Sequence, residues 1–307
     1  MNRHISRRIL GALVAVLAVT FITFIALDTT GDAATALAGE SASREQLAVL
    51  RAQLGLEQPV LARYAAFLAN ATRGDLGRSL VNNQPVANLL RERLPCTILL
   101  ALAACALALT LGMIVGIGAA THAGTRADTL LMGGAALGLA VPTFWSALLL
   151  MLLFSVRLRW LPVIGAEGIQ SFILPSVTLA IPTAAAIARL LRSSLLDVLR
   201  ADYVRTARAK GLKPRHILTQ HVVRNSLLPV VTMLGLHLGY LLGGAFIVET
   251  IFALPGLGRL TVQAIFDRDY PIVLGATLMI AVVYIAINLA VDLAHGWLDP
   301  QVARGAI

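Results

Sequence analysis

The chain has 307 residues, of which 58% are hydrophobic and 13% charged, and its formal net charge is +9. This composition excludes an ordinary soluble domain, and recurring apolar runs of about 20 residues have the length of a membrane-spanning helix. A β-barrel would instead alternate over segments of about ten residues. The basic residues lie at the ends of the apolar runs, so we attribute the charge to membrane orientation and not to nucleic-acid binding.

Six apolar runs predict six transmembrane helices in an all-α polytopic membrane protein. They lie at 9–27, 96–121, 130–155, 172–191, 227–251 and 272–294. We therefore expect a first transmembrane helix, an external lobe, a transmembrane domain that includes a cytoplasmic loop, and a cytoplasmic tail. Their ranges are 1–27, 28–95, 96–294 with the loop at 197–229, and 295–307. Cys96 and Cys105 fall at or inside an apolar run, where we expect reduced core residues.

The N-terminal region carries Arg3, Arg7 and Arg8 before the first apolar run. Basic residues favour the cytoplasmic side, and an even number of spans then places both termini in the cytoplasm. A cleavable signal peptide is the alternative, because Ala36-Leu37-Ala38 resembles a cleavage site. The apolar stretch is long for a signal peptide, and Asp28 precedes the supposed site, so we favour an uncleaved first span.

The external lobe, 28–95, is expected to be small and helical. Ser43 is a candidate helix cap, leucines follow at helical spacing, and Gly55 is a candidate stop. A second short amphipathic stretch begins at Gln58-Pro59 and contains Tyr64 and Phe67.

The loop between the fourth and fifth spans gathers charge and helix-breaking residues. From 192 to 224 it carries eight Lys or Arg against two acids. Good helix formers precede Gly211, residues 216–223 can be helical again, and Asn225 and Pro229 suit the start of the next span. The pattern predicts two short helices on the cytoplasmic surface, which a soluble partner could grip. Charge alone would indicate only a solvated positive-inside loop.

The spacing of this loop is specific. Ala207-x-x-x-Gly211, followed by Ile217 and by Asn-Ser-Leu-Leu-Pro at 225–229, resembles the EAA loop of permease subunits of binding-protein-dependent ABC importers. The fuller text is similar to the dipeptide/oligopeptide/nickel branch of that family. Further matching patches lie in collinear order along nearly the whole chain: GLEQPVLARY (55–64), GDLGRSL (74–80), VPTFW (141–145), ETIFALPGLGRL (249–260), RDYP (268–271) and NLAVDLAHGWLDP (288–300).

The resemblance implies one half of a transmembrane pore with the type I ABC importer permease fold. Its partners would be a second homologous permease, two cytoplasmic ATPase subunits, an extracytoplasmic binding protein and membrane lipid. Carried over by position, the elements that dock on the ATPase are Arg205, Thr206, Ala207, Lys210 and Gly211. The Glu-Ala positions that name the loop hold Arg205 and Thr206 here, so we expect a matching acidic residue on the partner ATPase.

Polar residues inside the spans are candidates for the translocation path, because ionisable groups are costly in a bilayer. His237 lies inside the fifth span with Met233 one turn before it and Tyr240 nearby. These residues either line the path or pack against a neighbouring helix. Glu249 and the bent turn with Pro255 and Gly256 are candidates for the external mouth and gate. We interpret 267–269 as surface ion pairs.

The sequence predicts a transporter subunit and not an enzyme. It contains no Walker-type phosphate loop and no metalloprotease or nucleophile-elbow motif, so we expect no cofactor on this chain and ATP on the partner subunits. The resemblance implies import of di- or oligopeptides, with nickel or a metal chelate as the alternative. A stand-alone secondary transporter, the alternative of another class, would show paired inverted repeats, which we do not see.

Overall fold

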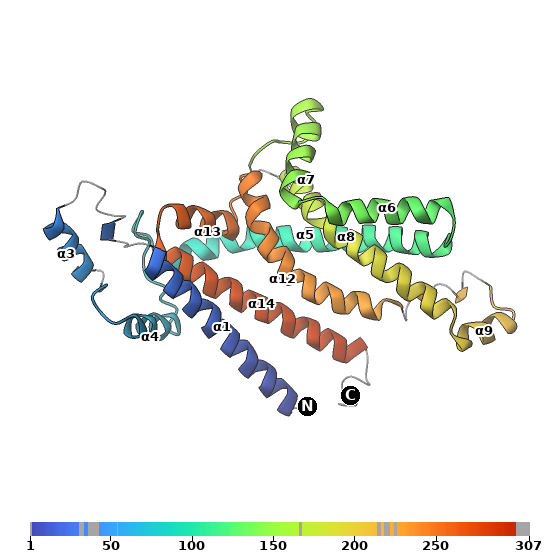
Figure 1. Ribbon diagram of the computed structural model, residues 1–307, viewed down its shortest axis with the longest axis horizontal. Coiled ribbons are helices and arrows are strands. Elements are labelled where there is room, and N and C mark those ends of the chain that lie inside the picture. Colours follow the sequence, from blue (N-terminus) through green and yellow to red (C-terminus); the bar gives the residue numbers. More distant parts are fainter. Residues whose placement is uncertain are drawn as a thin grey trace. The chain divides into compact units, whose positions relative to one another are not determined.

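The computed structural model covers residues 1–307, and the structure describes 2–30, 34–35, 43–53, 55–165, 168–213, 216–217, 222–223 and 226–298. Within these ranges the chain forms helices, turns and one isolated antiparallel bridge between Arg78 and Pro85 (Figure 1). The predicted all-α fold is confirmed. The chain divides into two compact units, one formed by 1–97 and 255–286 and the other by 98–254 and 287–307.

The first unit contains the 28–95 lobe, whose external location stays a prediction, and the helices that pack with it. Its helices are α1 (Asn2–Thr30), α3 (Arg44–Gln53), α4 (Val60–Ala71), the start of α5 (Val86–Thr121), α13 (Leu257–Phe266) and most of α14 (Tyr270–Leu298). Apolar side chains at the start of α5 pack with α13 and α14 around Val86, Leu90 and Leu257. Tyr64 joins α4 to α1 by donating to the Leu17 carbonyl at 2.8 Å.

The signals for helix boundaries in the lobe are confirmed. The Ser43 hydroxyl accepts the Gln46 N–H at 3.2 Å, and the Gln46 side chain accepts the Ser43 N–H at 2.9 Å. This reciprocal pair is a capping box at the start of α3. Gly55 follows α3 with φ of +67°, a left-handed conformation that glycine adopts without steric cost.

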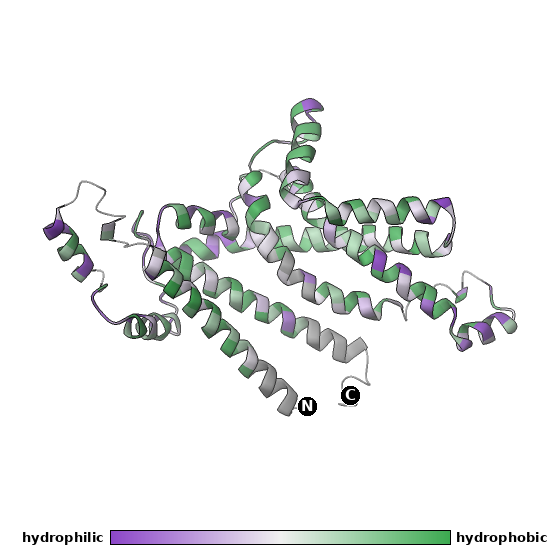
Figure 2. Ribbon diagram, in the orientation of Figure 1, coloured by the Kyte–Doolittle hydropathy of each residue, from purple (hydrophilic) through white to green (hydrophobic). Residues whose placement is uncertain are grey.

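The second unit contains most of α5 and the helices α6 (Arg126–Ala140), α7 (Thr143–Leu150), α8 (Gln170–Leu199), α9 (Asp202–Ala209) and α12 (Leu228–Ile251). A seven-residue π-helix, Met151–Arg157, continues α7. The most buried helix of the unit is α8, which packs against α6, α7 and α12. Apolar residues follow these helices, while hydrophilic residues gather at their turns and on α9 (Figure 2).

Glycines let α5 and α6 approach α8 closely. A Cβ added at Gly116 of α5 would lie 2.9 Å from the Ala188 carbonyl oxygen of α8. A Cβ added at Gly138 of α6 would lie 3.3 Å from side-chain carbons of Ile181 and Ala185. In a membrane no hydrophobic effect drives helices together, so association depends on close van der Waals packing, which small residues at such crossings permit. The sequence contained these glycines inside predicted spans, and the structure assigns them to the contacts of α8.

The predicted spans correspond to helices, with two differences. Among the described residues, four helices are long and apolar enough to cross a membrane, or five if α6 and α7 count as one bent span. The α6–α7 pair is bent by 105°, so 130–155 is not one straight helix. The bend falls at Val141-Pro142, where proline disfavours helical geometry in the residue before it.

The second difference is the start of α5 at Val86, ten residues before the predicted span at 96. The fifth predicted span, 227–251, corresponds to the 24-residue helix α12. Some side chains of α12 are not described, and this helix is not among the four membrane-spanning helices counted above. The total of six spans stays a prediction. The tail, 295–307, lies mostly outside the described residues.

Candidate functional site: the α9 coupling element

The helix α9 has one apolar face, and that face is buried within its own unit. Val204 is fully buried and Ala207 is 8% exposed. Both belong to the cluster formed with Ile187, Leu191 and Leu195 of α8. Residues three apart lie on the same side of a helix, so this pair fastens α9 to the helix that precedes it.

The opposite face of α9 is exposed and basic. The Arg205 side chain is 76% exposed, and Tyr203 is 45% exposed. Arg205 lies 3.4 Å from the Asp202 carboxylate, an exposed pair that contributes little to stability. Other exposed residues of the same segment are Thr206, Arg208, Lys210 and Lys213. Of the predicted docking residues, Ala207 therefore faces the chain's own core, whereas Arg205, Thr206 and Lys210 face outward.

Gly211 ends α9 in a left-handed conformation with φ of +78°. Its N–H donates to the Arg208 carbonyl at 3.0 Å, and the Leu212 N–H donates to the Ala207 carbonyl at 3.3 Å. These bonds satisfy carbonyls that the end of a helix leaves open. The predicted break at Gly211 is confirmed. Half of the second helix predicted at 216–223, and Asn225, lie outside the described residues. Pro229 stands in the first turn of α12 as expected.

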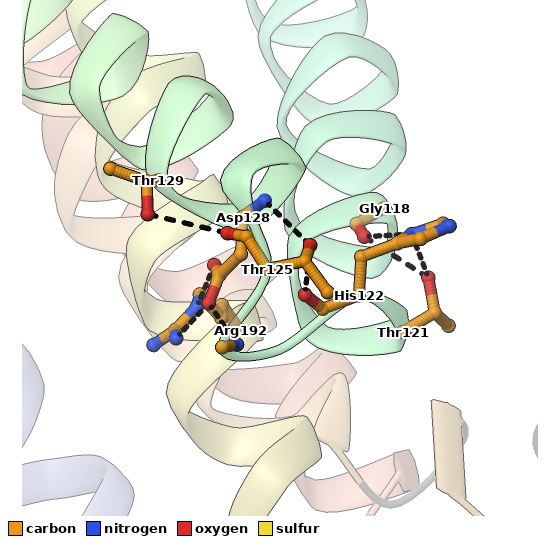
Figure 3. Close-up of polar contacts among 8 residues, drawn as sticks. Gly118, Thr121, His122, Thr125, Asp128, Thr129 and Arg192 are labelled. Carbon is orange, nitrogen blue, oxygen red and sulfur yellow. Dashed lines mark hydrogen bonds and ion pairs between the residues drawn. The ribbon is translucent and has the colours of Figure 1, made fainter.

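An ion pair that sequence reasoning missed lies close to this element. Arg192 of α8 donates from Nε and Nη2 to the two carboxylate oxygens of Asp128, each at 2.6 Å (Figure 3). Asp128 lies in the first turn of α6, and its Oδ2 also accepts the Gly124 N–H at 3.0 Å. The Thr125 hydroxyl caps the same helix. Arg192 was counted with the basic residues of the cytoplasmic loop, and no local pattern pointed from it to Asp128, 64 residues earlier.

The candidate path residues Met233, His237 and Tyr240 all lie on α12. Met233 packs against the core cluster that includes Val204 and Ala207. His237 is half-buried, and the side chain of Tyr240 lies outside the described part of the structure. Their lining of a path stays a prediction.

The candidate mouth and gate residues belong to different units and are described separately. In the second unit, Glu249 is fully buried near the end of α12. In the first unit, Gly256 is the N-terminal flanking residue of α13, directly after Pro255. The Leu257 N–H at this helix start donates to the Thr97 hydroxyl of α5 at 2.8 Å. Thr97, which sequence reasoning missed, therefore fixes the start of α13.

The interpretation of Asp269 as part of a surface ion pair is wrong. Asp269 is 2% exposed, and its Oδ2 accepts the hydroxyl proton of Ser79 at 2.5 Å. The Ser79 hydroxyl oxygen in turn accepts the N–H groups of Val81 and Asn82, each at 3.2 Å. The motifs GDLGRSL and RDYP thus meet within the first unit although 190 residues separate this pair. The two residues are far apart in the sequence, and the neighbouring charges of Asp267 and Arg268 favoured a surface ion pair instead.

Comparison with protein families identifies the class of this arrangement. The family described as "Binding-protein-dependent transport system inner membrane component" matches residues 95–304. The corresponding N-terminal family matches residues 1–101. The chain belongs to this family of transport permeases. It is therefore a multi-pass inner-membrane subunit of an ABC importer, and ATP is hydrolysed on a separate subunit. A stand-alone secondary transporter is thereby set aside.

Individual relatives support the same class along the full length of the permease. The chain is 40% identical to the "Glutathione transport system permease protein GsiC" of Escherichia coli O6:H1 over 303 residues, covering 98% of this chain and 99% of that protein. The GsiC protein of Salmonella paratyphi A is 39% identical with the same coverage.

Solved structures support the fold. An inward-facing MetNI methionine ABC transporter matches with a TM-score of 0.60 at 17% identity, covering 69% of this chain and 96% of that chain. An amino acid ABC transporter determined with histidines matches with a TM-score of 0.52 at 16% identity, covering 70% of this chain and 94% of that chain. The type I importer fold is thus confirmed. Membership of the family implies an ATPase and a binding protein as partners of this permease.

Proposed function

We propose that this permease imports glutathione-like short peptides as one half of a two-permease pore, with α9 as the element that docks on an ATPase subunit. The second half is a homologous permease, and two ATPase subunits bind on the cytoplasmic side. An extracytoplasmic binding protein delivers the peptide. Both termini lie in the cytoplasm, which puts α9 on the same side as the ATPase subunits. The chain itself binds no cofactor.

The two faces of α9 carry this proposal. Val204 and Ala207 fasten the helix to the core of its unit, so a push on α9 moves α8 with it. The exposed face presents Arg205, Thr206 and Lys210 to a partner, and Gly211 sets the direction in which the chain leaves the helix. A short helix that is fixed on one side and free on the other suits rigid-body transmission of ATPase closure.

The substrate class rests on the relatives and not on a site in this chain. The GsiC proteins are named for transport of glutathione, which is a tripeptide, and the identity of 40% extends over 98% of the chain. The nickel alternative gains no support from these relatives, so we favour a peptide. Within the pore, we assign Met233, His237 and Tyr240 to the path on α12, and Glu249, Pro255 and Gly256 to the external mouth and gate.

Reconstitution tests the proposal. The permease is assembled in proteoliposomes with its second permease, its ATPase subunits and its binding protein, and uptake of radiolabelled glutathione and dipeptides is measured with and without ATP. We expect uptake that needs both ATP and the binding protein. Uptake by this chain without any ATPase would refute the importer assignment, and ATP-dependent uptake of nickel without peptide would refute the substrate class.

A further inference from the structure

The ion pair between Arg192 and Asp128 lies where the coupling element joins the rest of its unit. Arg192 is on α8, about two helical turns before that helix ends at Leu199. The helix α9 begins directly afterwards at Asp202. Asp128 is on α6, the helix that follows the turn after α5. The pair therefore connects the base of the coupling element to a different helix and a different loop.

The geometry of this pair is more restrictive than that of a surface ion pair. Both carboxylate oxygens of Asp128 accept from the guanidinium group, each at 2.6 Å, and the Asp128 side chain is only 7% exposed. Two parallel bonds between planar groups fix their relative orientation as well as their distance. The Arg192 side chain is 29% exposed, which leaves part of the interaction screened by solvent.

The carboxylate is itself held from its own side. The Gly124 N–H donates to Asp128 Oδ2 at 3.0 Å, and Gly124 has φ of +80°. The Thr125 hydroxyl donates to the His122 carbonyl at 2.6 Å and accepts the Asp128 N–H (Figure 3). Hydrogen bonds thus link the residues of the turn between α5 and α6 to one another. Arg192 therefore bonds to a carboxylate that is already held in place by the backbone of this turn.

The apolar contacts of α8 do not supply the same constraint. A Cβ added at Gly116 of α5 would lie 2.9 Å from the Ala188 carbonyl oxygen and 3.1 Å from Leu191 Cβ, and Leu195 continues this apolar packing toward the end of α8. Such contacts oppose separation of the helices but carry no direction of their own, whereas a bidentate bond resists rotation and sliding. Near the end of α8 that leads to α9, Arg192 adds this orientational constraint to the apolar packing of Leu191 and Leu195.

We propose that Asp128 and Arg192 are positioning residues for coupling, which make α6 and its preceding turn move together with α8 and α9 when an ATPase subunit moves α9. Neither residue touches substrate or nucleotide in this role. This inference rests on the proposed function, because it requires that an ATPase subunit docks on α9 and moves it.

The test uses the complete reconstituted transporter with four changes in this permease: Arg192→Lys, Arg192→Ala, Asp128→Ala, and the double change Asp128→Ala with Arg192→Ala. Lysine keeps the charge but cannot form the two-pronged bond. The readout is peptide uptake per ATP hydrolysed, with co-purification of all subunits as the measure of assembly. We expect assembled transporters in which Arg192→Ala lowers this ratio by about five- to tenfold, since a charge-assisted bond is lost from a partly screened pair.

Arg192→Lys and the double variant distinguish a positioning role from a general loss of stability. Arg192→Lys should fall between wild type and Arg192→Ala, and the double variant should be no worse than the poorer single variant, because residues that act as a unit are not additive. A wild-type ratio in Arg192→Ala, additive losses in the double variant, or loss of assembly in all four variants would each overturn the inference. If the wild-type transporter shows no ATP-dependent uptake, the proposed function fails instead.

Discussion

Replacing Gly211 by valine should uncouple transport from ATP hydrolysis through backbone strain alone. Gly211 has φ of +78°, and a Cβ built at this position meets no heavy atom within 4 Å. Since the Cβ has open space, the main penalty comes from placing an L-residue in the left-handed region, about 1–2 kcal/mol. A penalty of this size lowers the ratio of the native turn to alternative conformations by roughly 5- to 30-fold. Uptake per ATP hydrolysed in proteoliposomes should fall by up to that factor, while membrane insertion stays intact.

Two controls isolate the position and the conformation. Gly211→Asn should couple almost normally, because asparagine tolerates the left-handed conformation. Gly74→Val imposes the same strain, at φ of +81° with equally open surroundings, but in the external lobe, so it should leave uptake per ATP unchanged. The reasoning is refuted if Gly211→Val keeps the wild-type ratio, or if Gly74→Val lowers the ratio as much.

Three further changes probe separate contacts. Gly116→Ala should destabilise the purified permease by about 1–3 kcal/mol, because its Cβ would lie 2.9 Å from a backbone carbonyl of α8. Gly133→Ala, also within a helix, meets nothing within 4 Å and should not lower the melting temperature. Ser79→Ala removes the donor to the buried carboxylate of Asp269 and should cost about 1–3 kcal/mol, measured as a lower melting temperature in detergent; an unchanged value would contradict the contact. Arg205→Glu reverses an exposed charge and should weaken ATPase binding several-fold at low salt but not at high salt, since screening removes such interactions; equal weakening at both would point to a packing role.

The membrane fold was largely predictable because its signals are local. Apolar runs near the length of a bilayer crossing predicted the positions of the long helices, and Ser43, Gly55 and Gly211 marked helix boundaries that the structure confirms. The bend between α6 and α7 was not predicted, although Val141-Pro142 marks it, because proline inside a membrane helix is often tolerated. The early start of α5 also escaped prediction, since its first turns carry charge and belong to the first unit.

The candidate site was predictable only where its residues are close in sequence. The α9 element lies within one loop, so spacing was enough to locate it. The bonds of Asp128 with Arg192 and of Ser79 with Asp269 join residues 64 and 190 positions apart, and such pairings depend on the tertiary fold. A basic residue at the end of an apolar run is most simply interpreted as setting membrane orientation. That interpretation gave no reason to look for an ion-pair partner of Arg192.

The division of α9 into a buried and an exposed face also explains why an unusual residue is tolerated at position 205. Val204 and Ala207 are buried in the chain's own core, so substitutions there change the fit of α9 to α8. Arg205 lies between them in sequence but has a side chain that is 76% exposed, so its identity is nearly free of constraint from this chain. An arginine in place of the glutamate of the EAA pattern therefore alters only what α9 presents to its partner. Under the proposed function, the outward face of α9 sets compatibility with an ATPase subunit, and the inward face with the Asp128–Arg192 pair transmits its motion to α8 and α6.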